Sequence, residues 1–306
     1  MRVVVTGGAG FLGSHLCRAL IGNGDSVVCV DDLSSGNKNN IKELENNPRF
    51  EYIKHDIIEP IEIAGRIDQI YHLASRASPP NYQNEPVHTA LTNSIGTNNM
   101  LRIAHKKRSV LLFASTSEVY GDPQQHPQKE AYNGNVSTIG VRGCYDESKR
   151  FGEALCMAYY RKHNVGVRIA RIFNTYGPMM YPNDGRVVST FVMQALHNKD
   201  ITVFGDGSQT RSFCYVDDMI KGLRLLMNSD TIGPVNLGNP HEISVLELAK
   251  KIIAMTKSRS KIIYQKLPED DPFKRMPDIS VALSLGWHPE TGLEQGLRAT
   301  INYFKG

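Results

Sequence analysis

Residues 3–16, VVVTGGAGFLGSHL, join an apolar run to three spaced glycines and then to a helical pattern. Gly7, Gly10 and Gly13 have GxxGxxG spacing, directly after the apolar run and directly before an amphipathic stretch. Glycines permit a tight turn and a close approach of the backbone to a pyrophosphate, and a helix N-terminus offers free N–H groups to phosphates. Three glycines alone are a weak signal, but in this context they predict a dinucleotide-binding strand–turn–helix unit.

The chain beyond this unit continues to alternate between strand-like and helical patterns. We predict strands at 2–6, 27–30, 50–54, 69–73, 110–114 and 166–171. We predict helices at about 11–23, 87–107 and 144–163. Alternation of this kind indicates βαβ units and an α/β fold with a doubly wound parallel sheet of the Rossmann type.

After Pro178 the predicted elements become shorter. Glycine and proline become frequent in 177–185 and 204–210. Ser244 and Glu247 have the spacing of a capping box, which predicts a helix that ends near Lys257. A last helix is predicted at about 293–304. We therefore expect a nucleotide-binding domain over 1–175, with 211–231 returning to it. A smaller, mixed α/β domain over 176–306 is expected to bind the substrate.

The composition is that of an ordinary globular protein and argues against several function classes. The chain has 306 residues and a net charge of +4 without a long basic run, so no nucleic-acid partner is expected. Its apolar runs are shorter than the ~20 residues of a membrane span, and its N-terminus resembles a strand rather than a signal peptide. The five cysteines are scattered without a CxxC pair, which favours reduced thiols and the cytoplasm. The ten histidines lack metal-ligand spacing, and no metal is expected.

Asp31 stands at the end of the second predicted strand. In dinucleotide sites a carboxylate at this position binds the adenosine ribose hydroxyls. The same charge repels a 2′-phosphate, so the sequence predicts NAD rather than NADP.

Tyr145 and Lys149, in YDESK, are separated by one helical turn and are expected on one helix face. A free tyrosine has a pKa near ~10 and is a poor base at neutral pH, but a neighbouring cation lowers that pKa. A Tyr-xxx-Lys pair is common and is usually only a surface feature. Its position after a dinucleotide pattern predicts a catalytic pair here.

Glu118 raises a question, because it follows Thr116 and Ser117 at the end of a short apolar run that we interpret as a buried strand. Ligands of open α/β sheets bind just beyond such strand ends. A salt bridge at the strand end is the structural alternative for Glu118. Together with the dinucleotide pattern, the strand end predicts a catalytic constellation.

Several motifs make the chain similar to the extended short-chain dehydrogenases/reductases. They are TGGAGFLG at 6–13, HLAS at 72–75, STSEVYG at 115–121 and the Tyr145/Lys149 pair. Along nearly the whole chain, further stretches closely resemble the UDP-glucuronate decarboxylases, also called UDP-xylose synthases. These stretches are CYDESKR, RIFNTYGP, DGRVVSTFVMQAL, FGDGSQTRSF, NLGNP and DDPFKRMPDI.

The resemblance implies that UDP-glucuronate is converted into UDP-xylose. C4 of the sugar loses a hydride to NAD⁺ while Tyr145 takes the proton of the C4 hydroxyl, and the C6 carboxylate becomes that of a β-keto acid. Carbon dioxide then leaves, and the NADH formed reduces the 4-keto pentose. Thr116 is expected to hydrogen-bond the C4 oxygen. Ser117 and Glu118 are expected to orient the ring near C5 and to manage the proton that replaces carbon dioxide.

The Ser117–Glu118 pair separates this pattern from two related activities. The sugar-nucleotide 4,6-dehydratases carry an Asp–Glu pair at this strand end, and Ser117 stands where that aspartate would be. The related 4-epimerases usually have a small or hydroxyl residue where Glu118 stands. The pair therefore matches the decarboxylase pattern.

The resemblance also assigns the binding residues. Arg211 matches a family arginine near the reacting end or the diphosphate, and is expected to act in catalysis and in substrate binding. Arg275 and Arg186 are expected at the UDP diphosphate, and Asn174 at the substrate. Further substrate contacts are predicted at Asn99, Thr175 and Gln209. Besides the glycines, Asp31 and the Tyr145/Lys149 pair, the predicted cofactor contacts are Phe11, Leu12, Asp32, Ser34, Ser35, Gly36, Asp56, Ile57, Leu73, Ser75, Thr92 and Ala114.

Three positions depart from the family pattern. Arg76 replaces a proline and adds a charge that we expect beside the nicotinamide end, Met179 stands where arginine is usual, and Leu91 stands where lysine is common. The changes compensate one another within one pocket, or they shift the substrate or product. In this family, helices matching 87–107 and 145–163 pair across a two-fold axis, which implies a homodimer. Their apolar residues fit an ordinary core equally well.

Other functions stay open at this point. A 4-epimerase would invert C4 without loss of carbon dioxide, and another relative would release the UDP-4-keto-pentose. A protein of a different class, a non-catalytic NAD sensor, should have lost part of the constellation. Thr116, Tyr145 and Lys149 are all present, which favours an enzyme.

Overall fold

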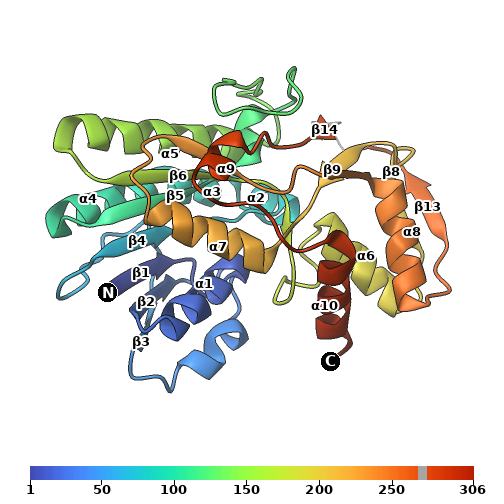
Figure 1. The fold of residues 1–306 in the computed structure, drawn as a ribbon, viewed down its shortest axis with the longest axis horizontal. Coiled ribbons are helices and arrows are strands. Elements are labelled where there is room, and N and C mark those ends of the chain that lie inside the picture. Colours follow the sequence, from blue (N-terminus) through green and yellow to red (C-terminus); the bar gives the residue numbers. More distant parts are fainter. Residues whose placement is uncertain (268–273) are drawn as a thin grey trace.

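A computed structural model describes residues 1–267 and 274–306 of the chain. Residues 270–273 of the DDPFKRMPDI motif lie outside the described residues. Within the described part, seven parallel strands form a central sheet in the order β11-β6-β5-β4-β1-β2-β3 (Figure 1). The strands are β1 Arg2–Thr6, β2 Ser26–Asp31, β3 Phe50–Lys54, β4 Gln69–His72, β5 Val110–Thr116, β6 Val167–Ile172 and β11 Pro234–Leu237. The predicted Rossmann-type α/β fold is confirmed.

Helices cover both faces of the sheet (Figure 1). The long helices are α1 Phe11–Gly22 and α7 Val216–Met227 on one face, and α4 Thr97–Lys107 and α5 Gly143–His163 on the other. Side chains alternate along β1, so that Val3 packs in a cluster with Leu16 of α1, whereas Val4 packs with Met100 of α4 and Cys156 of α5. Because both faces of the sheet are covered, its strands are apolar runs rather than alternating ones.

The helical prediction over 87–107 is confirmed, because the chain is helical without a break from Pro86 to Lys107, with one π-helical turn inserted. The chain forms α2 Pro79–Asn84, α3 Pro86–Leu91, a π-helical turn over Thr92–Gly96, and then α4. Pro86 starts a new helix because it lacks the N–H that would continue the preceding one. In the π-helical turn, a Cβ at Gly96 would lie 2.7 Å from Cδ1 of Ile57, so this helix packs tightly against the chain that follows β3.

The last part of the chain adds three small sheets and four helices to the described structure (Figure 1). The sheets pair β7 Thr175–Tyr176 with β10 Cys214–Tyr215, β8 Ile201–Phe204 with β13 Ile262–Gln265, and β9 Thr210–Ser212 with both β12 Glu242–Ser244 and β14 Lys274–Arg275. The helices are α6 Val187–Leu196, α8 Val245–Thr256, α9 Ser280–Ser284 and α10 Leu293–Lys305. The capping box of Ser244 and Glu247 is present at the start of α8.

The central sheet receives its edge strand from late in the sequence. The segment 211–231, predicted to return to the first domain, contains α7, which covers the central sheet. The added strand β11 comes just after this segment. The domain boundary at 175/176 stays a prediction. No helix among the described residues is long and apolar enough to cross a membrane.

Candidate active site

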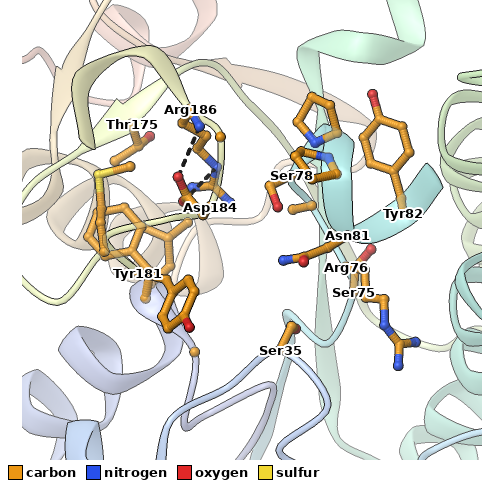
Figure 2. Close-up of a pocket in the computed structure, with 18 of the residues that line it drawn as sticks. Ser35, Ser75, Arg76, Ser78, Asn81, Tyr82, Thr175, Tyr181, Asp184 and Arg186 are labelled. Carbon is orange, nitrogen blue, oxygen red and sulfur yellow. Dashed lines mark hydrogen bonds and ion pairs between the residues drawn. The ribbon is translucent and has the colours of Figure 1, made fainter. Parts of the chain in front are cut away.

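A cavity of about 1340 Å³, called the cleft below, lies at the carboxyl ends of the central strands. Figure 2 shows Thr175, Asp184 and Arg186 on one side of it, facing the segment that runs from Ser75 to Tyr82. The cleft is lined by residues of the Rossmann part and of the C-terminal part. This is the position at which open α/β sheets bind their ligands.

The glycines of the first turn form a cradle at one end of the cleft. Gly7 has a φ of +71°, and a Cβ at Gly13 would lie only 2.0 Å from the carbonyl oxygen of Gly7. Gly10, the N-cap of α1, provides no side-chain cap, and the first turn of α1 has no acidic residue. The first amides of α1 therefore keep their hydrogen-bonding capacity for an anion, which fits the pyrophosphate of a dinucleotide.

Asp31 anchors the loops around the predicted ribose position. Its carboxylate accepts hydrogen bonds from the amides of Ala9, at 3.0 Å, and Leu33, at 2.8 Å. A Cβ at Gly36 would lie 2.7 Å from this carboxylate, so the loop passes close over it. Burial raises the pKa of Asp31 above its ordinary value, although the two amides act in the opposite direction.

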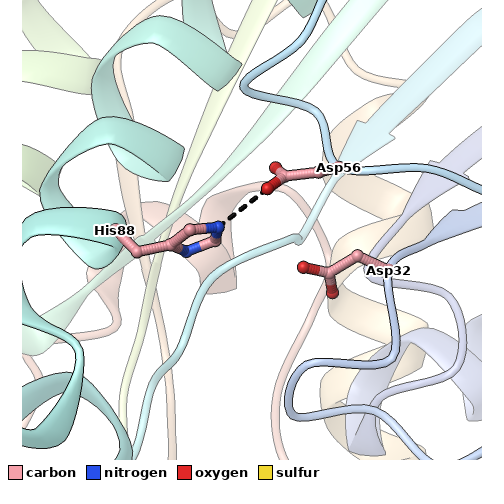
Figure 3. A group of neighbouring side chains, drawn as sticks. All are labelled: Asp32, Asp56 and His88. Carbon is pink, nitrogen blue, oxygen red and sulfur yellow. Dashed lines mark hydrogen bonds and ion pairs between the residues drawn. The ribbon is translucent and has the colours of Figure 1, made fainter.

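Asp32, Asp56 and His88 gather nearby, with ligand-type atoms within 4.8 Å of one another (Figure 3). Arg76 contacts Nδ1 of His88, and because arginine only donates hydrogen bonds, this nitrogen accepts. Nε2–H of His88 then donates to Oδ2 of Asp56 at 2.8 Å. Both ring nitrogens are engaged, so a metal ion would have to displace one of these partners. Arg76 lies with residues predicted to bind the cofactor.

Tyr145 and Lys149 are both buried in the cleft, as two residues on one helix face. Nζ of Lys149 donates to the carbonyl oxygen of Ala114 at 2.8 Å and lies 5.8 Å from the centre of the Tyr145 ring. Burial lowers the pKa of Lys149 to about 7. Burial also raises the pKa of Tyr145, against a hydrogen bond with the Thr116 side chain that lowers it. The expected lowering of the pKa of Tyr145 is therefore not seen in the protein alone.

Glu118 lies in the short 3-10 turn Ser117–Tyr120 that follows β5. Its Oε2 contacts Nη2 of Arg142, and its Oε1 contacts Nη1 of Arg275. Burial alone would raise the pKa of Glu118, but the two guanidinium groups outweigh it and lower this pKa to about 2. The carboxylate is therefore ionised and held between two cations.

The sequence analysis did not predict two neighbours of Tyr145 and Glu118, the aromatic Tyr82 and the cationic Arg142. The Tyr82 ring stacks on the Tyr145 ring, with centroids 5.0 Å apart, and its buried hydroxyl has no hydrogen-bond partner among the described residues. The Arg142 guanidinium lies 6.0 Å from the centre of the Tyr82 ring. The position of Arg142, three residues before Tyr145 and thus one helical turn away, was the available signal.

The predicted substrate residues are mostly brought to the cleft. Arg211 is buried there, and its Nη1 donates to the carbonyl oxygen of Thr210 at 2.8 Å. Arg186 lies beside Asp184 (Figure 2), with Nε and Oδ2 3.4 Å apart. The other predicted substrate residues in the lining are Asn174, Thr175, Gln209 and Arg275.

Asn99 is not in the described lining of the cleft. Its side-chain amide donates instead to the carbonyl oxygens of Ile57, at 3.0 Å, and Ile58, at 2.9 Å. These bonds satisfy the backbone after β3, which explains why a polar side chain is buried there. All predicted cofactor residues line the cleft: Gly7, Gly10, Phe11, Leu12, Gly13, Asp31, Asp32, Ser34, Ser35, Gly36, Asp56, Ile57, Leu73, Ser75, Thr92, Ala114, Tyr145 and Lys149.

The other two departures from the family pattern lie apart from each other. Met179 lines the cleft, and its sulfur contacts Nη1 of Arg18 at 2.9 Å. Leu91 is not in the described lining and is 36% exposed at the end of α3. Leu91 therefore changes the polarity of a surface, whereas Met179 and Arg76 change the lining of the cleft.

A Rossmann sheet with a dinucleotide cradle beside a buried Tyr–Lys pair defines a nicotinamide-dependent enzyme of the short-chain dehydrogenase/reductase type. Residues 3–238 match the NAD dependent epimerase/dehydratase family, and the chain belongs to this family. Its cofactor is NAD, as the charge of Asp31 predicted.

The chain is similar to curated relatives over its full length. It is 54% identical over 306 residues to UDP-glucuronic acid decarboxylase 4 of Arabidopsis thaliana, a match that covers 100% of this chain and 69% of the relative. It is 53% identical over 304 residues to UDP-glucuronic acid decarboxylase 1 of Danio rerio, with 99% and 72% covered.

Solved structures show the same fold. UDP-glucuronic acid 4-epimerase from Bacillus cereus, in complex with UDP-glucuronic acid and NAD, has a TM-score of 0.89 and 30% identity, covering 100% of this chain and 99% of that one. UDP-glucose 4-epimerase from Thermotoga maritima, with UDP-glucose, has a TM-score of 0.92 and 30% identity with the same coverage.

Proposed function

We propose that the protein is a UDP-glucuronate decarboxylase that forms UDP-xylose and keeps its NAD. The observation that carries this proposal is the ionised Glu118, just after β5, between Arg142 and Arg275. It lies close enough to Tyr145 of α5 for its charge to act on the phenol. The names of relatives that are more than half identical over the full chain support it.

The chemistry begins at C4 of the sugar. Bound NAD supplies a hydride acceptor for C4 and later a donor. Tyr145 accepts the proton of the C4 hydroxyl, and Thr116, which already hydrogen-bonds Tyr145, holds the C4 oxygen. Because burial raises the pKa of Tyr145, the phenolate needs a cation close by, and Lys149 is placed to supply it in its protonated form.

Oxidation at C4 makes the C6 carboxylate labile. The electron pair of the C5–C6 bond moves toward the C4 carbonyl, neutral carbon dioxide leaves, and C5 then takes a proton. Arg142, Arg275 and Arg211 all act electrostatically on Glu118. Guanidinium groups are suited to bind the substrate carboxylate and to stabilise the negative charge that develops on the C4 oxygen.

The remaining site assignments follow from the lining of the cleft. We propose that Arg186 and Gln209 bind the nucleotide diphosphate end, with Asn174 and Thr175 beside the sugar. Ser117, directly before Glu118, orients the ring near C5. Arg211 serves the reacting end, because its charge acts on Glu118.

We also propose that two copies of the chain form a homodimer in the cytoplasm. Val87, Leu91 and Ile95, from α3 and the π-helical turn, are exposed, and so is Phe151 of α5. α3 and α5 pack against each other, which makes these side chains neighbours of one surface that suits an apolar interface. All five cysteines are free thiols, as a reducing compartment requires.

The test is to incubate the purified protein with UDP-glucuronate and NAD⁺ and to follow carbon dioxide and the sugar by NMR. UDP-xylose without net NADH supports the full cycle. A 4-keto pentose with accumulating NADH means that the last reduction fails. Inversion at C4 without carbon dioxide would make the protein a UDP-glucuronate 4-epimerase, the activity named for the Bacillus cereus structure.

A further inference from the structure

A second, smaller cavity of about 250 Å³ lies behind Glu118 and is called the side cavity here. Glu118, Arg142 and Arg275 line both the cleft and the side cavity, so they form the wall between the two. Asp122, Asn135 and Ser137 also line the side cavity, and these three residues are exposed. The side cavity therefore extends from the wall that contains Glu118 to residues at the surface.

Asp146 is the unexplained residue in this side cavity. It is only 5% exposed, yet its Oδ1 has no hydrogen-bond partner among the described residues. Its Oδ2 lies 3.8 Å from Nε of Arg142, the same arginine whose Nη2 contacts Glu118. A buried carboxyl oxygen without a partner is costly, unless the group carries a proton or contacts water.

The arrangement couples two carboxyl groups through one arginine. Burial and the negative charge of Glu118 raise the pKa of Asp146 to about 7, whereas Glu118 itself is ionised. Below about pH 7, this pair of carboxyl groups therefore holds about one proton, mainly on Asp146. A cavity of this volume and polar lining has room for several water molecules, since each takes about 30 Å³.

We propose that the side cavity is the proton entry path of the decarboxylase, and that Asp146 stores the proton that Glu118 passes to C5. This inference rests on the proposed function. When the substrate carboxylate binds beside Arg142 and Arg275, it competes with Glu118 for their charge, and Glu118 becomes a better proton acceptor. The proton moves from Asp146 to Glu118 and on to C5, where it pairs with the electrons left by the broken C5–C6 bond. Solvent in the side cavity returns a proton to Asp146.

The first test separates carbon dioxide loss from C5 protonation in single-turnover experiments with Asp146→Asn. We expect carbon dioxide to appear within about twofold of the wild-type rate, while UDP-xylose forms about 10-fold more slowly or worse. Asp230→Asn is the matched control, because Asp230 is an exposed aspartate that is in the described lining of neither cavity. This control should leave both rates unchanged. Equal slowing of both steps in Asp146→Asn would indicate a purely structural role and would overturn the proposal.

The pH dependence gives a second readout. In the wild type, UDP-xylose formation should lag further behind carbon dioxide release as pH rises above about 7, because Asp146 loses its proton there. In Asp146→Asn the lag should be large at every pH. The charged and titratable groups that act on Asp146 are Glu118, Arg142, Arg275, Glu147, Tyr82 and Tyr145. A lag that keeps the wild-type pH profile in the variant would overturn the proposal.

A third variant tests the cavity without changing a titratable group. Val136 lines the side cavity, and Val136→Trp should fill it and delay UDP-xylose but not carbon dioxide. No delay in this variant, with a normal circular dichroism spectrum, would overturn the path. A wild-type protein that releases no carbon dioxide would instead remove the proposed function, and the proton path with it.

Discussion

The two ends of the cleft use charge in opposite ways. At the cofactor end the proposed anion-binding groups are backbone amides of α1, and the carboxylate of Asp31 is fixed by the backbone amides of Ala9 and Leu33. At the sugar end Glu118 is held by Arg142, at the start of α5, and by Arg275 of β14. These hydrogen bonds of the Asp31 carboxylate span at most 22 residues, whereas Glu118 and Arg275 are 157 residues apart, so the two ends should fail differently when altered.

The largest expected effect lies at the sugar end. Tyr145→Phe removes the proton acceptor for C4, and kcat should fall by about 10³-fold. The affinity for NAD should change less than about threefold, because the glycine cradle is untouched. Steady-state kinetics and NAD titration by fluorescence measure the two quantities. Tyr160→Phe, on the same helix, serves as the control, and an equal loss in that variant would contradict the assignment.

The next effect is that of Glu118→Gln. The change leaves two guanidinium groups without their carboxylate and removes the group that passes a proton to C5. We expect kcat to fall by about 10²-fold while NAD affinity is kept. A variant that retains wild-type turnover would show that Glu118 is only a structural ion-pair partner.

At the cofactor end, Gly13→Ala should weaken NAD binding by more than about tenfold, or about 1.4 kcal/mol. Its Cβ would lie 2.0 Å from the carbonyl oxygen of Gly7, so the turn must open. Gly22→Ala is a matched control at the other end of α1, where a Cβ meets nothing within 4 Å. Calorimetric titration with NAD⁺ compares them, and similar affinities would mean that the cradle is not the pyrophosphate site.

The pH dependence of stability distinguishes the two ends further. The folded protein lowers the pKa of Glu118 from 4.5 to about 2. The resulting stabilisation is complete above about pH 4.5 and is lost as pH falls toward about 2, because protonation breaks both ion pairs. Thermal unfolding between pH 6 and pH 3 should therefore show a larger loss for the wild type than for Glu118→Gln. Parallel curves would show that the ion pairs contribute little.

The smallest effect is expected at Arg76. Its guanidinium contacts His88, and His88 donates to Asp56, so Arg76→Ala should change the cofactor end mainly by loosening these two residues. NAD affinity should fall by about threefold with kcat unchanged. A large change in kcat would place Arg76 at the sugar end after all.

The same contrast explains what the sequence could predict. The strand, turn and helix around Gly7 and Gly13, and the shared helix face of Tyr145 and Lys149, depend on residues that are close in sequence. The contact of Arg275 with Glu118 depends on β14 pairing beside β9, which no local pattern indicates. The hydrogen bonds of Asn99 to the backbone of Ile57 and Ile58 likewise depend on a distant segment, and no local pattern indicates them.

The helix at 87–107 shows a second limit. The segment is helical throughout, as its periodicity predicts, but it includes a π-helical turn at Thr92–Gly96. Gly96 of this turn packs closely on Ile57, a contact between segments far apart in sequence. Such a contact leaves no trace in helical periodicity.

The Glu118–Arg275 ion pair joins positions that are 157 residues apart. A ribosome makes the glycine cradle well before Arg275, so a nascent chain carries its dinucleotide turn long before the charges of the sugar end are assembled. Until Arg275 has been made, Glu118 lacks one of the two guanidinium groups that contact it. The order of synthesis thus leaves the sugar end of the cleft to be completed after the cofactor end.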